Sequence, residues 1–486
     1  MKEPVRVHVW TCVLSVLLST SVYASGQASF ELLNPLSVLP QVGLVQKALR
    51  ALRSNIEAFD GSVPRAVGFE NTAVIADDYS TTVRFTQNYN QIEVYGHDSF
   101  VHFDRDGIIH DVAGSLGAMA GASEKATLTA AQALQIAASR HRDRLDLSEA
   151  TQLKLYQDSQ KRLRLVYVLM TRDPETLGGR QIFVDARSGD VLLDLSRVYD
   201  ADFKGTVFSA DTPAAHEHIG DRGAPTGVNL DWYLKDATDE SSIRANRNSE
   251  AVYTYYKSNF NRRSYDNANA TMVSVAHMGL HYNNAFWSDA FKIMAYGDGD
   301  GERLNDLTNG LDVAAHEMTH AVTANTAKLV YAAEPGALNE SYSDVFGKMV
   351  DYTEGNWYIG GKVMANGALG IRNLKNPGEF GQPDTATSPL RVPTPSVEEC
   401  AGPFADDYCG VHTNSGIPNR AAALIAEAIG KQNAEQLYYK VLSTRLSATS
   451  DFKDARKQTE EECSLKFNSG SRECNAVSSA FETVGM

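Results

Sequence analysis

The chain has 486 residues, of which 43% are hydrophobic and 22% charged, and its formal net charge is −15. The length is too great for one ordinary domain, and the composition is that of a folded globular protein rather than a disordered or fibrous one. The acidic balance argues against nucleic acid and against an anionic membrane surface as binding partners.

The N-terminal residues have the pattern of a secretory signal peptide. Lys2 and Arg6 precede an apolar run at residues 9–18, and Val22, Tyr23 and Ala24 follow the small-x-small rule for cleavage. The rival interpretation is a membrane anchor, but the run is shorter than a bilayer-spanning helix and no later run is apolar enough to span. We therefore predict a signal peptide at residues 1–24 and a secreted, extracellular chain that is not bound to a membrane.

Mixed helical and strand patterns follow the signal segment. The apolar spacing predicts a helix near residues 44–52, then strands at 82–89, 92–96 and 100–103. A second group has a helix at 129–137 and strands at 163–169, 181–185 and 191–193. From 201 to 250 we expect turns and modest strands, before a helix that ends near Phe260 and a short strand at 271–277.

The most informative motif is His316-Glu317-Met318-Thr319-His320, which lies within a predicted helix at residues 311–324. Positions i and i+4 share one helix face, so both imidazoles can reach a single metal ion. His-Glu-x-x-His is the pattern of zinc metallopeptidases, with the glutamate as general base toward the attacking water. The pentapeptide alone also occurs by chance, and catalytic zinc usually has a third protein ligand.

A second helix, predicted at residues 336–347, supplies that ligand. Glu340 and Asp344 are four residues apart and therefore share one face. A solvated acidic face is the simpler interpretation, but the neighbouring residues are small or apolar, as in a packed helix. Because buried carboxylates need a partner, we predict that Glu340 is the third zinc ligand and that Asp344 orients a ligand histidine.

The cysteine pattern favours disulfides. Cys12 leaves with the signal peptide, and the four that remain allow three connectivities. Pairing of sequence neighbours is the simplest, namely Cys400 with Cys409 and Cys463 with Cys474. A cysteine-bound metal is the alternative, but these spacings fit no common zinc pattern.

These motifs resemble the thermolysin family of secreted zinc endopeptidases. In that family, nineteen residues separate His-Glu-x-x-His from the glutamate of an Asn-Glu-x-x-x-Asp motif, as they do here with Asn339, Glu340 and Asp344. The resemblance implies an α+β protein with a two-lobed catalytic domain and the zinc ion in the cleft. The β-rich N-terminal lobe with the zinc helix would span residues 199–345, and the α-helical C-terminal lobe would span 346–486.

The N-terminal residues resemble the precursor modules of the same family. The run from Arg84 to Tyr89 is similar to the fungalysin and thermolysin propeptide module, here 25–120, and residues 121–198 resemble a PepSY module. The implied role of this propeptide is to assist folding and to inhibit the protease until it is cut. A permanent N-terminal domain is the alternative.

The family also implies roles for individual residues. Glu317 would be the general base, and His412, its tautomer fixed by Asp407, would stabilise the oxyanion together with Tyr331. Substrate binding is implied for Asn284 and the backbone of Ala285, which belong to a strand thought to lie at a sheet edge, and for Arg372. The pocket for the residue after the scissile bond would involve Leu304, Leu307, Val313 and Ile371, so we expect cleavage before bulky hydrophobic residues.

Calcium is where the chain departs from the family pattern. Asp312 and Asp351 match family calcium ligands, but the loop that follows Asp351 is short and poor in carboxylates. Calcium needs six or more oxygen ligands, so one weak site or none is expected in place of a stabilising pair.

The resulting prediction is a monomeric metalloendopeptidase with one catalytic zinc ion, acting on proteins and peptides. A metalloaminopeptidase shares the chemistry but normally has one residue fewer before the third ligand. A zinc-binding or adhesion protein without activity would lack Glu317 or His412, and both are present. An inhibitor built from the N-terminal modules alone would not carry the site.

Overall fold

The computed structural model describes residues 43–60, 66–117, 125–141, 145–172, 178–200, 239–279, 281–353, 355–401 and 406–486. The predicted signal peptide, and most of the segment between residues 201 and 250, lie outside these ranges. None of the helices in these ranges combines the length and the apolar character that crossing a membrane requires.

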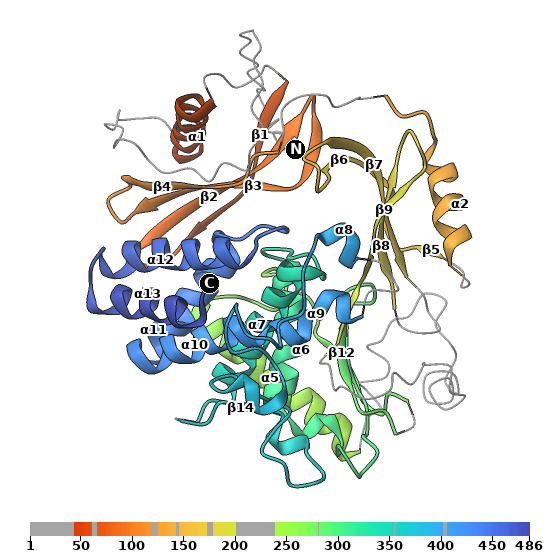
Figure 1. Ribbon diagram of the computed structural model, residues 1–486, viewed down its shortest axis with the longest axis vertical. Coiled ribbons are helices and arrows are strands. Elements are labelled where there is room, and N and C mark those ends of the chain that lie inside the picture. Colours follow the sequence, from red (N-terminus) through yellow and green to blue (C-terminus); the bar gives the residue numbers. More distant parts are fainter. Residues whose placement is uncertain are drawn as a thin grey trace, which may run out of the picture.

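The N-terminal unit is built on one continuous sheet with two helices (Figure 1). Its first half contains α1 (Leu44–Asp60), β1 (Val67–Ala76), β2 (Ser80–Tyr89), β3 (Ile92–Asp104) and β4 (Ile109–Gly114). Its second half contains α2 (Ala130–Arg140), β5 (Asp146–Leu147), β6 (Gln152–Gln157), β7 (Leu163–Arg172), β8 (Arg180–Asp185) and β9 (Val191–Ser196). The order is β1-β2-β3-β6-β7-β8-β9, with β4 beside β3 and β5 beside β7. The halves meet where β3 runs parallel to β6, at Val94 and Leu155.

Each half of this sheet has its own apolar core. Ala48, Leu52 and Ile56 of α1 pack on Val83 and Phe103. In the second half, α2 packs on β7 and β8 through a separate cluster. The predicted helices and strands of this region are all present, and residues 92–103 form a single long strand.

The C-terminal half has a lobe that contains strands and a lobe of helices. A small sheet with the order β10-β12-β13-β11 belongs to the first lobe. The elements are β10 (Val198–Asp200), α5 (Glu240–Phe260), β11 (Val273–Val275), β12 (Ala285–Ser288), β13 (Ile293–Tyr296), η1 (Leu307–Asn309), α6 (Leu311–Ala324), α7 (Ala333–Val350), β14 (Tyr358–Ile359), η2 (Gly361–Val363), β15 (Arg372–Asn373), η3 (Pro377–Phe380), α8 (Val397–Cys400), α9 (Asp407–Asn414), α10 (Gly416–Ile429), α11 (Lys431–Thr444), α12 (Phe452–Phe467) and α13 (Arg472–Val484). One large apolar cluster joins both lobes around α6 and α7.

Residues 240–250 differ from the expectation of modest strands, because they form the first half of α5. Asp239 caps this helix by accepting a hydrogen bond from the Ser242 backbone N–H. Ala245, Ser249, Val252 and Tyr256 recur at helical spacing and are buried. The many polar residues between them obscure this period in the sequence.

Both predicted disulfides are present, joining Cys400 to Cys409 and Cys463 to Cys474. The second bridge ties α12 to α13. The first closes a loop that leads into α9, where Asp407, Tyr408, Cys409 and Gly410 all have positive φ, between 46° and 78°. A residue with a β-carbon rarely adopts this conformation, so the loop is held by its surroundings.

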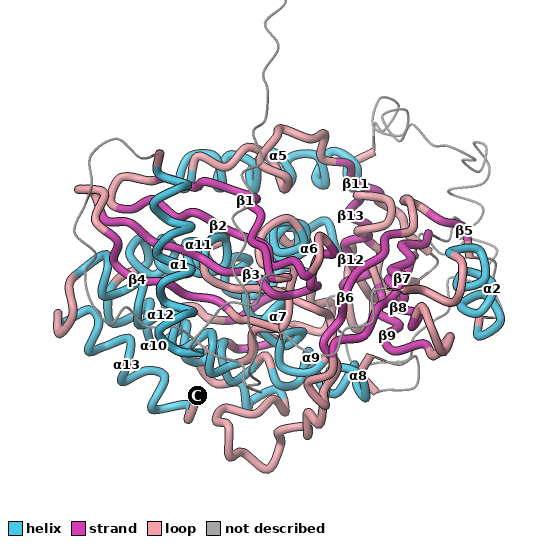
Figure 2. The backbone as a smooth tube through the Cα atoms, turned by 90° about the horizontal axis from the view of Figure 1, so that it is seen from above, coloured by secondary structure: helices cyan, strands magenta, loops and turns pink. Residues whose placement is uncertain are grey.

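The N-terminal unit rests on the helical lobe, with its β2–β4 region beside α12 (Figures 1 and 2). Buried charges join the two parts. Arg445, at the end of α11, is fully buried and contacts Asp111 of β4 at 3.1 Å and Glu462 of α12 at 2.6 Å. His102 of β3 also contacts Asp111, at 2.7 Å, and the Thr444 carbonyl. We call Asp111, His102, Arg445 and Glu462 the interface ion cluster.

Candidate active site

Helix α6 carries the central motif at the centre of the molecule. Residues 312–323 are all buried, because α5, α7 and β12 pack against the helix from different sides. A helix surrounded in this way is expected to be apolar all round. His316, Glu317 and His320 are therefore exceptions that burial makes costly unless they have partners.

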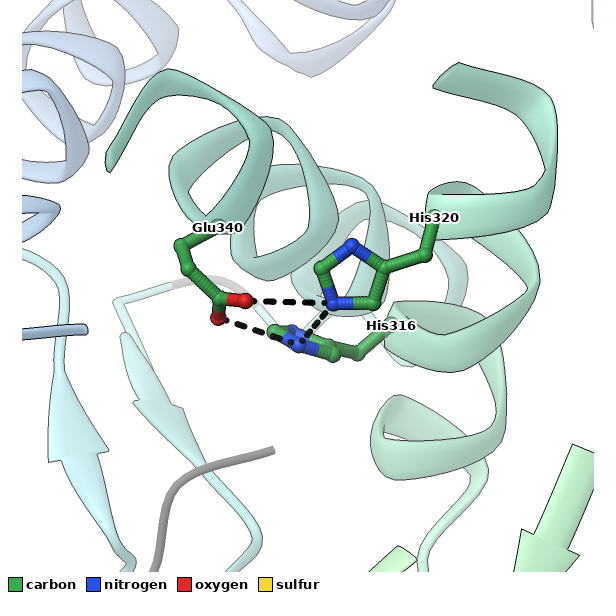
Figure 3. Close-up of side chains that lie close together, drawn as sticks. All are labelled: His316, His320 and Glu340. Atoms are coloured by element: carbon green, nitrogen blue, oxygen red, sulfur yellow. Dashed lines mark hydrogen bonds and ion pairs between the residues drawn. The ribbon is translucent and has the colours of Figure 1, made fainter. Parts of the chain in front are cut away.

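The three predicted zinc ligands converge on one point, with two contributed by α6 and one by α7 (Figure 3). The Nε2 atoms of His316 and His320 are 3.0 Å apart. Glu340 places Oε2 3.4 Å from His316 Nε2 and Oε1 3.3 Å from His320 Nε2. Tetrahedral zinc with bonds of about 2.0–2.1 Å separates its ligand atoms by about 3.3–3.4 Å. The residues therefore fit a zinc ion with one position left for water or substrate.

The other ring nitrogens of both histidines face acceptors. His316 Nδ1 lies 2.9 Å from Asp344 Oδ1, and His320 Nδ1 lies 2.8 Å from Asn339 Oδ1. Donation from Nδ1 sets the tautomer in which Nε2 presents a lone pair to a metal ion. Burial lowers the pKa of His320 to about 3, so this ring is neutral at neutral pH. Burial opposes ionisation of Glu340, but His412, His320 and His316 hold its pKa well below the usual range.

Asp344 is fully buried and is held by two further residues. Arg372 donates to both of its oxygens, with Nη2 2.7 Å from Oδ1 and Nε 2.9 Å from Oδ2. Asn419 of α10 donates to Oδ2 at 2.8 Å. Burial raises the pKa of Asp344, but Arg372 and His316 outweigh it and bring the value to about 2. The carboxylate that faces His316 is therefore ionised.

Glu317 is fully buried beside the cluster. Burial, and then the negative charge of Glu317, raise the pKa of Tyr296 in β13. The Glu317 carboxylate therefore lies near β13, within the same helix turn as the two histidines.

His412 and Tyr331 both contact the carboxylate of Glu340, the third predicted zinc ligand. His412 Nε2 lies 3.4 Å from Glu340 Oε1 and 3.0 Å from the Tyr331 hydroxyl, which itself donates to Glu340. His412 Nδ1 lies 2.5 Å from Asp407 Oδ1. The left-handed loop at residues 407–410 folds Asp407 back onto His412, so the ring orientation depends on that loop.

The predicted substrate-binding residues lie in three different settings. Ala285 opens β12, and its N–H donates a hydrogen bond to Asn284 Oδ1. Contrary to the expectation of a sheet edge, β12 lies between β13 and β10, which pairs residues 198–200 with 286–288. Leu304, Leu307 and Val313 are buried in the main core and Ile371 is half-buried against it. Arg372 is paired with Asp344.

Three residues that hold the site were not foreseen. Asn419 supports Asp344, Ser343 lies 3.1 Å from His320 Nδ1, and Gln382 donates to the His412 carbonyl. Ser343 lies four residues after Asn339, on the face that already bears it, and could have been proposed from helical spacing. Asn419 and Gln382 come from other elements, and no local pattern points to them.

Comparison with known proteins adds to this geometry. Residues 194–324 match the model described as the thermolysin metallopeptidase catalytic domain, and residues 327–486 match its alpha-helical domain. Residues 72–116 match the fungalysin/thermolysin propeptide motif. The fold and the site define a metalloendopeptidase that carries an N-terminal propeptide. The chain belongs to the thermolysin family of metallopeptidases, which is zinc-dependent.

Several curated relatives share most of their length with the chain. Bacillolysin from Bacillus subtilis (strain 168) is 32% identical over 476 residues, covering 90% of this chain and 88% of the relative. Thermolysin from Alicyclobacillus acidocaldarius subsp. acidocaldarius is 30% identical over 471 residues, covering 84% and 83%. A solved precursor of protealysin, a metalloproteinase from Serratia proteamaculans, is 31% identical over 51% of this chain and 80% of its own, with a TM-score of 0.46.

The contact between Asp344 and His316 predicts a loss of zinc affinity. Replacing Asp344 by Asn keeps the shape but removes the charge that faces His316 Nδ1, so the zinc dissociation constant should rise about 10- to 100-fold. Competition with a chromogenic zinc chelator measures it. Asp384→Asn, at a half-exposed carboxylate paired with Arg420, is the matched control. Equal affinities for both variants would show that Asp344 does not act on the ligand.

Proposed function

We propose that this protein is a secreted zinc endopeptidase, made as a zymogen that processes itself. The observation that carries the proposal is the convergence of His316, His320 and Glu340 on one point, beside the buried carboxylate of Glu317. A purely structural zinc site would be closed by a fourth protein ligand. Within the described residues, the cluster of histidine, cysteine and acidic side chains at this point has three members.

Each residue has a defined part in the proposed reaction. Zinc, when bound, polarises the scissile carbonyl and acidifies the attacking water. Glu317 accepts a proton from that water and passes it to the leaving amine. His412, oriented by Asp407, donates toward the developing oxyanion, and Tyr331 assists. Asp344 and Asn339 keep both zinc-binding histidines in the required tautomer.

The substrate preference follows from the apolar residues around the N-terminus of α6. We propose that Leu304, Leu307, Val313 and Ile371 form the pocket for the residue after the scissile bond. Asn284 and the Ala285 backbone would align the peptide as an added strand, and Arg372 would contact its carbonyl.

The junction between the N-terminal unit and the catalytic domain bears on the zymogen part of the proposal. Residues 198–200 pair with 286–288 of β12 in the antiparallel sense, and the match to the thermolysin catalytic domain begins at residue 194, so β10 is part of the catalytic sheet. We propose that the N-terminal unit, residues 25–198, is the propeptide, that it aids folding, and that it inhibits the protease until it is cut.

Further contacts would keep the propeptide in place. Besides the interface ion cluster, Tyr156 of β6 donates to Glu398 of α8 at 2.5 Å. A cavity of about 300 Å³ lies between the units, lined by Tyr95 and Gln181 on one side and Lys328 and Tyr331 on the other. We propose that the propeptide, seated against this cavity, restricts access to Tyr331.

The general-base assignment predicts the effect of replacing Glu317 by Gln. Because the amide cannot accept the proton, kcat should fall by about 10²–10⁴-fold while zinc remains bound. The propeptide should also stay attached. Assays on casein, zinc analysis and N-terminal sequencing of wild type and variant measure these properties. Full processing and activity in the variant would contradict the proposal, and inert proteins that bind zinc would favour a non-catalytic zinc-binding protein.

The apolar pocket predicts cleavage before Leu, Phe, Ile or Val. In a panel of peptides that differ only in the residue after the scissile bond, kcat/KM for Leu should exceed that for Asp or Lys by at least about 10-fold, the discrimination that burying a few methylene groups supplies. Mass spectrometry of the products locates each cut. Preferred cleavage before charged residues would refute the pocket.

The interface ion cluster predicts how long the propeptide inhibits after cleavage. Asp111→Asn removes the carboxylate that faces Arg445 but leaves the mature enzyme unaltered, since Asp111 belongs to the propeptide. Truncating one partner of a buried charge pair weakens association by about 2–5 kcal/mol. The lag before full activity should therefore shorten, with the final activity unchanged. Asp106→Asn, in the exposed turn before β4, is the control, and equal lags in both variants would exclude this role.

A further inference from the structure

A corner of the catalytic domain, distinct from the zinc site, contains buried charges for which the proposed reaction has no use. It is formed where the N-terminus of α6 approaches the C-terminus of α7 and the segment from β14 to η2. Asp312 and Lys348 are both almost fully buried there, with 4% and 3% of their surfaces exposed. Asp351 and Lys362 lie at the rim of the same corner.

The oxygen atoms of the two carboxylates are already engaged. Asp312 Oδ1 accepts from the Val313 N–H at 2.9 Å, and Oδ2 accepts from the Gly360 N–H at 2.7 Å. Both oxygens of Asp351 accept from Lys362 Nζ, at 2.9 and 3.2 Å. These are the two residues that match family calcium ligands, but their lone pairs are directed at N–H donors.

Lys348 supplies positive charge to the interior of the corner. Its Nζ donates to the Tyr358 carbonyl at 3.2 Å, which fixes the ammonium group between the strand and the helix. Burial lowers the pKa of Lys348, and the charges of Asp312 and Asp351 oppose this shift without reversing it. Burial likewise raises the pKa of Asp312, and Lys348 opposes that shift. Lys348 also lies in the last turn of α7, where the helix dipole favours a cation, just as the first turn of α6 favours Asp312.

This chemistry does not fit a calcium ion. Calcium requires six to eight oxygen ligands, and an ammonium group within the same corner repels a divalent cation. Among the residues that the structure describes, sets of three ligand-type side chains within metal-binding distance occur at the zinc site and around Asp111, not here. The calcium site that the family resemblance offered as one alternative is therefore not formed at this corner.

We propose that Lys348, with Lys362 at the rim, is the resident cation of this corner, so that Asp312 and Asp351 stabilise the fold without calcium. The α6–α7 contact is especially close here, since a β-carbon at Gly347 would lie 2.8 Å from the Asp312 carbonyl oxygen. A charge supplied by the chain holds the metal helix in place even where calcium is scarce.

The test measures thermal unfolding of the full chain, dialysed free of calcium and loaded with zinc. All variants also carry Glu317→Gln, so that self-digestion does not set the midpoint. Calcium is added to about 10 mM, well above the dissociation constants of weak extracellular sites, with magnesium at equal ionic strength as the reference. The calcium-specific shift in the midpoint is compared between the chain with Asp351 and the chain with Asp351→Asn. Equal shifts support the proposal, and a larger shift with Asp351 overturns it.

Replacing Lys348 by Met tests the role of the ammonium group. Met keeps most of the buried stem but leaves Asp312 and Asp351 without their internal cation, so the midpoint should fall by several degrees. Calcium should restore part of the loss, whereas Lys348→Arg should remain near the original midpoint. A Lys348→Met protein as stable as its parent would overturn the proposal. If this variant does not fold, the calcium-specific shifts with Asp351 and with Asp351→Asn still test whether the corner binds calcium.

Lys362→Met is the matched control for position. The Lys362 side chain is 60% exposed and pairs with a carboxylate at the rim, so solvent already screens most of the interaction. The midpoint should change by less than in Lys348→Met. A greater loss at Lys362 than at Lys348 would place the compensating charge at the surface and overturn the assignment of Lys348.

Discussion

The contact between α6 and α7 is the constraint on which the rest of the structure depends. It removes His316, His320, Glu340 and Asp344 from water together, and a buried ion is costly unless another group compensates it. Here each group compensates the next. Arg372 and Asn419 hold Asp344, Asp344 orients His316, and Glu340 faces both imidazoles. If Arg372 or Asn419 were removed, the buried charge of Asp344 would lose a partner. Because these two residues belong to β15 and α10, the need to pair Asp344 constrains where both elements pack.

The requirement that a buried charge has a compensating group also applies at two other places in the chain. At the interface with the N-terminal unit, Arg445 is buried between Asp111 and Glu462. At the corner of α6 and α7, Lys348 is buried in the last turn of α7 and donates to the Tyr358 carbonyl, two residues before the Gly360 N–H that Asp312 accepts from. In all three places the compensating cation is a side chain of the protein, and in the described part of the chain the zinc site is the place where three fully buried ligand-type side chains converge. Direction of the lone pairs, rather than the number of acidic residues, separates a metal site from a structural ion pair.

The sequence was sufficient for features that depend on local spacing. The metal ligands could be predicted from the i, i+4 spacing of the histidines and the interval to Glu340. The disulfides could be predicted from the short spacing of the cysteine pairs. The sequence was insufficient where partners are distant, as for Asp111 and Arg445, which are 334 residues apart. Asn419, Lys348 and the pairing of β10 with β12 were missed for the same reason. The first half of α5 was missed because polar residues on its exposed side hide the helical period.

These distant contacts bear on how the proposed zymogen would be released. The N-terminal unit is held at two separate places on the helical lobe, by the hydrogen bond from Tyr156 to Glu398 of α8 and by the interface ion cluster. While the chain is intact, each contact keeps the other at high effective concentration. A cut at the end of this unit removes the covalent link but leaves both contacts, so cleavage and release are separate events. Asp111 and Arg445 then matter most after the cut, since from that point only non-covalent contacts hold the inhibitor.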